Sequence, residues 1–72
     1  MTNSEYNKAR VALGKKLLDA REGLGLTQSE VAEKSSMHVN YYARMERGVA
    51  NPSFEKLQSV MRILRLKSLD LF

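Results

Sequence analysis

The chain has 72 residues and a mass of 8.2 kDa, so residues 1–72 are expected to form one small domain without a separate catalytic or effector module. A hydrophobic fraction of 43%, a charged fraction of 28%, one proline and four glycines favour a compact fold and exclude a disordered or fibrous chain. The absence of cysteine excludes a disulfide scaffold, cysteine-zinc sites and thiol catalysis. A core this small without such cross-links favours help from a partner subunit.

The net charge is +4 and the isoelectric point is near 9.7, which is compatible with a polyanionic partner such as nucleic acid but does not identify one. No apolar run approaches the roughly 18 residues of a membrane span. The first residues, Met1 to Tyr6, lack the basic-then-apolar plan of a signal peptide. We therefore expect a cytoplasmic protein with no membrane partner.

The first half of the chain predicts two helices. Apolar residues recur at helical spacing at Leu13, Leu17, Ala20 and Leu24, which predicts a helix over about residues 5–23, with residues 1–5 allowed as a flexible tail. After two glycines, residues 27–30 read Thr-Gln-Ser-Glu, the pattern in which each end side chain caps the backbone amide of the other. A second helix is expected to begin there and end near residue 35. Its buried residues are expected to be Val31 and Ala32.

The second half predicts three more helices. The third runs from His38 to Glu46 with Tyr42 and Met45 buried, and Gly48 fits a left-handed C-cap. Residues 51–53, Asn-Pro-Ser, read as a turn and an N-cap. The apolar stripe of the fourth helix consists of Phe54, Leu57, Val60, Met61 and Leu64. A short fifth helix is expected near residues 68–72, and no segment alternates with period two for long enough to predict a strand, so the class is all-α with five helices.

A capped second helix, a short turn and a third helix match the helix-turn-helix plan, in which the second helix of the pair enters the major groove of DNA. Two sequence segments support this interpretation. Residues 26–32 read Leu-Thr-Gln-x-Glu-Val-Ala, and residues 46–53 read Glu-Arg-Gly-x-x-Asn-Pro-Ser. With them the chain resembles the XRE, or phage-repressor-like (lambda, 434 and Cro), helix-turn-helix family. Other matching residues are Leu13, Gly14, Leu17, Arg21, Gly25, Tyr41, Arg44, Leu57, Leu71 and Phe72. The resemblance implies a compact lambda-repressor-like domain.

Three positions depart from the family pattern. Ser36 stands in the turn between the second and third helices, and Arg65 follows the fourth helix, where the family often has glycine. A left-handed conformation at Ser36 would strain the backbone. Tyr42 stands where an aliphatic core residue is usual, so its hydroxyl is expected to reach an edge or a partner.

The first turns of a recognition helix face the base edges, so five residues are expected to read bases: His38, Val39, Asn40, Ala43 and Arg44. Arg44 can place two donors on guanine O6 and N7, Asn40 can pair with adenine N6 and N7, and Val39 or Ala43 can touch a thymine methyl. The resemblance points independently to Val39, Asn40 and Arg44. The alternatives are a solvated or ion-paired Arg44, an ordinary exposed asparagine at position 40, and a His38 without a DNA role.

Residues expected at DNA phosphates are Gln28, Tyr41, Arg47, Asn51 and Ser53. The resemblance assigns the phosphate clamp to Gln28, at the start of the second helix, and sometimes a role in bracing the recognition helix. Simple turn and cap chemistry remains an equal explanation for Asn51 and Ser53, and a solvated charge for Arg47. The resemblance also implies a partly buried ion pair between Arg21 and Glu46, whose role would be structural.

The chain offers no convincing catalytic or metal set. His38 is the only histidine, so neither a histidine cluster nor a Ser-His-Asp or Cys-His arrangement can be assembled. We therefore expect no enzyme activity, no metal, no cofactor and no small-molecule ligand.

A single recognition helix reads only a few base pairs, so the domain is expected to pair and read two half-sites. Leu66 and Leu71 are assigned mostly to the monomer core, while Ile63, Leu69 and Phe72 are expected to form a symmetric homodimer interface. The alternative is complete burial of all five side chains within one subunit.

Without a sensor domain, a nucleophile for autocleavage or a predicted ligand pocket, regulation would depend on concentration, dimerisation and site occupancy, which favours an autoregulatory protein. Such a stand-alone domain resembles the controller proteins of restriction–modification systems, and compact phage Cro-like repressors are close alternatives. An antitoxin or a protein-interaction module with the same fold also stays open. Asn40 and Arg44 beside Gln28 argue against a pure interaction module, whereas a stoichiometric protein partner would favour an antitoxin.

Overall fold

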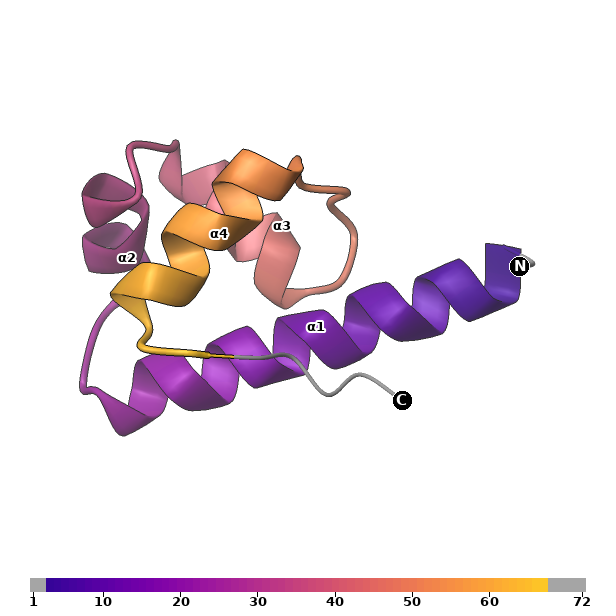
Figure 1. Cartoon of the computed structure of the whole chain (residues 1–72), viewed down its shortest axis with the longest axis horizontal. Coiled ribbons are helices and arrows are strands. Elements are labelled where there is room, and N and C mark those ends of the chain that lie inside the picture. Colours follow the sequence, from indigo (N-terminus) through magenta and orange to yellow (C-terminus); the bar gives the residue numbers. More distant parts are fainter. Residues whose placement is uncertain (1–2, 68–72) are drawn as a thin grey trace.

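The computed structural model describes residues 3–67 and contains four α-helices within them. These are α1 (Asn3–Gly23), α2 (Gln28–Lys34), α3 (Val39–Glu46) and α4 (Phe54–Ile63). Figure 1 shows α1 lying along one side of the molecule, with its first turns extending beyond the cluster formed by the three shorter helices. The all-α prediction is confirmed for the described residues, whereas the fifth helix expected near residues 68–72 lies outside them.

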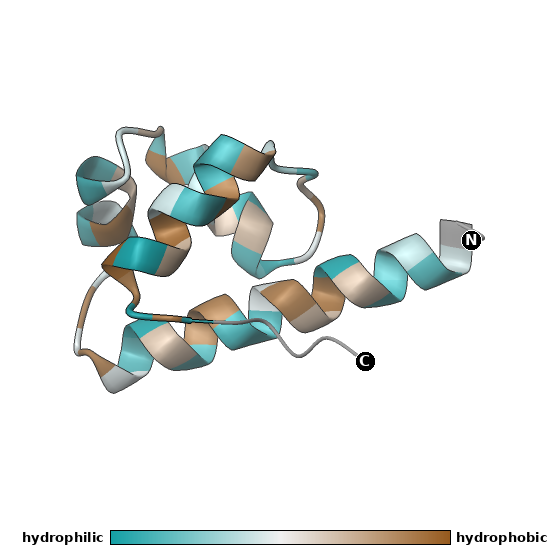
Figure 2. Cartoon of the chain, in the orientation of Figure 1, coloured by the Kyte–Doolittle hydropathy of each residue, from teal (hydrophilic) through white to brown (hydrophobic). Residues whose placement is uncertain are grey.

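Helix α1 begins at Asn3, so residues 3–5 belong to the helix and not to the tail that the sequence allowed. The core contains nine buried apolar residues: Leu13, Leu17, Val31, Ala32, Tyr42, Met45, Ala50, Val60 and Leu64. Apolar and polar residues alternate along the helices in Figure 2, as expected for helices that bury one side and expose the other.

Two residues of the predicted apolar stripes are exposed instead. Leu24 is 37% exposed because α1 ends at Gly23, one residue earlier, and the chain turns away there. Phe54, the first residue of α4, is 73% exposed. The buried side of α4 is carried by Val60 and the adjoining Leu64 instead.

The amino ends of the three shorter helices are capped by side chains. Thr27 and Glu30 form the predicted capping box, with Thr27 Oγ1 accepting from the Glu30 N–H at 3.0 Å and Glu30 Oε1 accepting from the Thr27 N–H at 2.8 Å. The resulting hydrogen bonds lower the pKa of Glu30. Ser53 caps α4 as predicted, and Ser53 Oγ accepts from the Lys56 N–H at 3.2 Å. The sequence therefore locates the starts of α2 and α4 correctly.

All four helices end in the same way, with the two reverse hydrogen bonds of a Schellman motif. After α3, for example, the Gly48 N–H donates to the Met45 carbonyl at 3.1 Å and the Val49 N–H donates to the Arg44 carbonyl at 3.0 Å. Each motif needs one left-handed residue, and these residues are Gly25 (φ 70°), Ser36 (φ 56°), Gly48 (φ 77°) and Arg65 (φ 60°). Ser36 and Arg65 carry a Cβ in this conformation, so each holds backbone strain of about 1 kcal/mol.

Two glycines let α1 and the end of α3 meet backbone to backbone. A Cβ on Gly14 would lie 2.7 Å from the Met45 carbonyl oxygen and closer still to that of Glu46. A Cβ on Gly48 would lie 2.8 Å from Val11 Cα. The carboxyl end of α3 is therefore seated directly on α1, which fixes the direction in which α3 leaves the body.

Candidate nucleic-acid interface

The two sides of α3 differ sharply in burial. Tyr42 is 0% exposed and Met45 is 1% exposed, and α3 packs through them against α1 and α2. On the other side, Asn40 and Arg44 are exposed one helical turn apart, with Val39 and Ala43 half-buried beside them. The structure thus brings the predicted base-reading residues together on the solvent side of α3, whose other side packs against α1 and α2.

His38 precedes this helix and is its N-cap, so α3 begins one residue later than predicted, at Val39. The His38 Nδ1 accepts a hydrogen bond from the Asn40 N–H at 3.1 Å. The ring is exposed, but this bond fixes its position close to the helix start. His38 therefore has a local capping role, and a base contact would have to be made by the remaining edge of the ring.

A hydrogen-bonded ion pair joins α1 to the end of α3. Arg21 Nε donates to Glu46 Oε2 at 2.6 Å, and Arg21 Nη2 donates to Glu46 Oε1 at 3.2 Å. The two side chains are only 14% and 4% exposed. Arg21 Nη1 also donates to the Leu26 carbonyl at 2.9 Å. The pair therefore ties together α1, the turn that follows it and α3.

The same carboxylate reaches α2, because Gln28 Nε2 donates to Glu46 Oε1 at 2.8 Å. Burial alone would raise the pKa of Glu46, but hydrogen bonds from Arg21 and Gln28 and the nearby Tyr42 hydroxyl together lower it. The hydrogen bond with Glu46 also raises the pKa of Arg21. Both groups are therefore charged at neutral pH, and Glu46 holds the predicted phosphate clamp Gln28 in a fixed position.

The Tyr42 hydroxyl is buried and makes no hydrogen bond of regular geometry within the described residues, but it lies next to Glu46 and Arg21. Burial raises the pKa of Tyr42, and the neighbouring Glu46 carboxylate adds to this shift. The side chain is fully buried among the core residues. The hydroxyl therefore stays protonated beside the ion pair.

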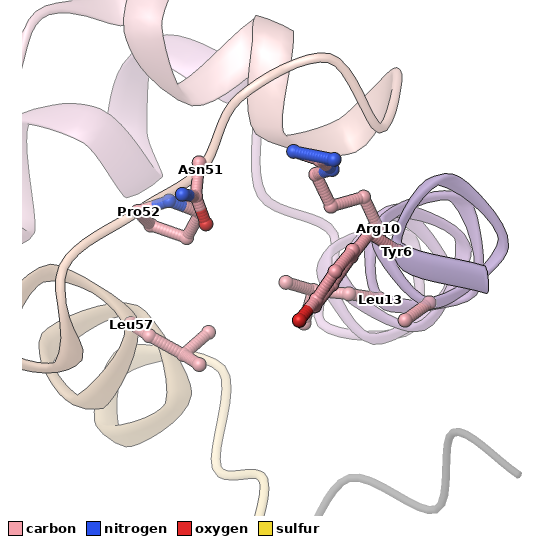
Figure 3. Close-up of a pocket in the computed structure, with 7 residues that line it drawn as sticks. Tyr6, Arg10, Leu13, Asn51, Pro52 and Leu57 are labelled. Atoms are coloured by element: carbon pink, nitrogen blue, oxygen red, sulfur yellow. The ribbon is translucent and has the colours of Figure 1, made fainter. Parts of the chain in front are cut away.

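The other predicted phosphate residues gather around the α3–α4 turn. Arg47, Asn51 and Ser53 are exposed, and Tyr41 is half-buried. Ser53 is engaged as the cap of α4, which bears out the cap chemistry that the sequence left open for it. Figure 3 shows the turn across a hollow from α1, and the hollow of about 400 Å³ is lined by Tyr6, Ala9, Arg10, Leu13, Asn51, Pro52 and Leu57.

Sequence reasoning overlooked Lys56 at this place. Its Nζ lies 5.2 Å from the centroid of the Tyr41 ring, a cation–π distance that joins the first turn of α4 to α3. The signal in the sequence is the position of Lys56 three residues after the Ser53 cap, which puts it on the first turn next to the α3–α4 loop. Lys56 is therefore a cation beside Tyr41 that was not among the predicted phosphate residues.

Of the predicted dimer residues, Ile63 is half-buried and packs against the core, while Leu69 and Phe72 lie outside the described residues. Leu66 is also half-buried against the core, and Leu71 lies outside the described part. Among residues 3–67, no cluster of three or more His, Cys, Asp or Glu could hold a metal ion. Within that same range, no helix is both long and apolar enough to cross a membrane.

A comparison with protein families adds one finding. A family model described as helix-turn-helix matches residues 17–72, from the second half of α1 to the end of the chain. Searches of curated proteins and of solved structures found no match.

Proposed function

This chain belongs to the helix-turn-helix family of DNA-binding transcriptional regulators, and we propose that it reads a pseudo-palindromic operator in duplex DNA as a homodimer. The observation that carries the proposal is the two-sided burial of α3: Tyr42 and Met45 lock one side, and Asn40 and Arg44 project from the other. A helix held in this way can enter the major groove without first being ordered.

The base-reading step rests on four side chains. Arg44 donates two N–H groups to guanine O6 and N7, and Asn40 pairs with adenine N6 and N7. Val39 and Ala43, half-buried beside them, present methyl groups to thymine. His38, as the N-cap, orients the first turn of α3 and contributes at most one further donor.

Phosphate contacts on the flanks orient α3 in the groove. Gln28 uses one amide N–H for Glu46 and keeps the second N–H, together with the backbone at the start of α2, for a phosphate. On the opposite flank, the contacts come from Tyr41, Arg47 and Asn51, with Lys56 added beside the Tyr41 ring. Because the Glu46 carboxylate accepts hydrogen bonds from both Arg21 and Gln28, the phosphate clamp Gln28 is connected directly to the end of the recognition helix α3.

Dimerisation through Ile63, Leu69 and Phe72 would place two copies of α3 about one turn of DNA apart. Within the family, we propose an autoregulatory role as the controller protein of a restriction–modification system, with a phage Cro-like repressor as the alternative. Sequence resemblance supports this assignment, and the identity of the neighbouring genes tests it.

The experiment that tests the function is selection of binding sites from random duplex DNA with the purified chain. The expected result is an enriched motif with two inverted half-sites centred 10–10.5 base pairs apart or a multiple of that spacing. Exposed Arg44→Ala should lose the preference at one position of each half-site, while Lys15→Ala, on the exposed side of α1, serves as a matched loss of one positive charge. Recovery of no motif from well-folded protein would contradict the proposal.

A further inference from the structure

A second hollow, of about 340 Å³, lies at the end of the molecule where three turns meet. Leu24 and Leu26 come from the α1–α2 turn, Lys34 from the last turn of α2, and Arg62, Ile63 and Arg65 from the end of α4 and the residues after it. The hollow is therefore lined by three apolar side chains, called the floor (Leu24, Leu26 and Ile63), and by three cations, called the rim (Lys34, Arg62 and Arg65).

The three rim cations have no ion-pair partner within residues 3–67. The Arg21–Glu46 bridge is the ion pair found there, and it does not involve Lys34, Arg62 or Arg65. Lys34 has a weak electrostatic interaction with Glu30, one helical turn earlier, without forming an ion pair. All three side chains are exposed. The rim thus offers three uncompensated positive charges around apolar side chains.

Arg65 adds an independent observation, because its backbone is left-handed with φ 60°. Glycine would adopt this conformation without strain, so the arginine side chain is held there at the expense of stability. The strained residue is also one of the rim cations.

The hollow is separate from the proposed DNA-reading residues. Those residues come from the start of α2, from α3 and from the α3–α4 turn, whereas the hollow is built from the end of α2, the α1–α2 turn and the end of α4. The apolar floor also distinguishes it from a phosphate site, which needs donors but no hydrocarbon surface. An occupant that carries both a carboxylate and apolar side chains would match this lining.

We propose that the hollow receives residues 68–72 of a second copy of this chain. These residues read Ser-Leu-Asp-Leu-Phe, so a carboxylate at Asp70 stands between Leu69 and Leu71 with Phe72 following. Asp70 meets the cationic rim, and Leu69 and Phe72 cover the floor around Ile63. The inference rests on the homodimer proposed above and deepens it, since it supplies the surface that the tail occupies.

The occupant is a second copy because the hollow shares Ile63 with the predicted homodimer interface, to which Leu69 and Phe72 of the tail also belong. Reciprocal exchange between two copies gives two equivalent contacts, as two-fold symmetry requires.

A charge exchange between copies tests the proposal. R62E should weaken self-association at least ten-fold because the new carboxylate faces Asp70, and D70R should do the same because two cations then meet. In an equimolar mixture of R62E and D70R, each hollow meets a tail of opposite charge, so the mixture should recover dimers that neither variant forms alone. Sedimentation equilibrium of the purified full chains measures this, and thermal melts of each variant verify folding.

The strained arginine supplies a second test with a matched control. R65G removes one rim charge and relieves the strain, so it should raise the melting temperature of the monomer while weakening dimerisation about two- to five-fold. S36G relieves the same kind of strain in a turn outside the hollow, so it should raise the melting temperature and leave dimerisation unchanged.

Four outcomes would overturn the inference. Unchanged dimerisation of both R62E and D70R would show that the hollow is not the contact, and a selected inverted-repeat motif would then leave the proposed function standing. Weakened singles without recovery in the mixture would place the tail in its own hollow. A smaller salt dependence of DNA binding by R62E, with dimerisation unchanged, would assign the rim to DNA. A chain that stays monomeric even on its selected DNA would refute both the inference and the homodimer.

Discussion

Replacing Glu46 by glutamine tests how strongly the α1–α2–α3 connection holds the fold. The carboxylate accepts hydrogen bonds from Arg21 at 2.6 and 3.2 Å and from Gln28 at 2.8 Å. E46Q keeps the shape, but it removes the charge and turns one acceptor into a donor that faces other donors. Arg21, 14% exposed, would then be left without its counter-charge.

The expected loss is about 3 kcal/mol, the lower part of the range for breaking a buried pair, because Arg21 keeps its bond to the Leu26 carbonyl. A domain of this size has a free energy of unfolding of about 4–11 kcal/mol. E46Q should therefore still fold, with a melting temperature lower by about 12–24 °C. Urea unfolding at pH 7 gives the free energy directly. The exposed Glu33→Gln serves as the matched control and should change it by less than about 0.5 kcal/mol.

E46Q and the wild-type protein should also differ in how their free energy of unfolding depends on pH. The pKa of Glu46 is lowered in the folded state from an ordinary value of 4.5, so its contribution to stability is present above pH 4.5 and is lost as the pH falls through the folded-state pKa. The wild-type protein should lose stability in this acid range more steeply than E46Q. A loss below 0.5 kcal/mol at pH 7, or parallel curves for the two proteins below pH 4.5, would refute this account of the connection.

Four further substitutions test the recognition face and the backbone. Arg44→Ala should lose about 1–3 kcal/mol of affinity for the selected site and relax one base position; full selectivity in competition titrations would reject base contact. Gln28→Ala should weaken all duplexes alike and lower the slope of affinity against salt, so a loss confined to one base pair would contradict a phosphate role. Gly14→Ala should destabilise the fold by about 1–3 kcal/mol in urea, because its Cβ would press on the Met45 and Glu46 carbonyls; unchanged stability would mean that α1 moves aside freely. Ser36→Gly should stabilise the fold by about 0.5–1 kcal/mol, and a lower melting temperature would show that φ 56° carries no strain.

Local chemistry made much of this fold predictable. The capping box at Thr27, the cap at Ser53 and the left-handed Gly48 depend on hydrogen bonds between near neighbours in the sequence, and all three are confirmed. The strain expected at Ser36 is also present. Leu24 and Phe54 were misplaced because a periodic stripe does not say where the helix stops lying against its neighbours.

Longer-range features needed the three-dimensional structure. The bond between Gln28 and Glu46 joins residues 18 positions apart, and only the packing of α2 against α3 brings them together. The Lys56–Tyr41 contact and the hollow at the end of α4 likewise join separate elements. The resemblance suggested the Arg21–Glu46 pair and a bracing role for Gln28 in advance, but it did not indicate that Gln28 braces the recognition helix through Glu46.

Measured affinities for two duplexes test the central claim most directly. Fluorescence anisotropy at physiological salt, with the selected operator and a scrambled duplex of equal length, should give affinities that differ at least 1,000-fold. The ratio should collapse in the N40A/R44A double variant while its melting temperature stays close to that of the wild type, since both side chains are exposed. Equal affinities of the folded wild-type protein for the two duplexes, or an unchanged ratio in the double variant, would contradict the assignment of α3 as the element that reads DNA.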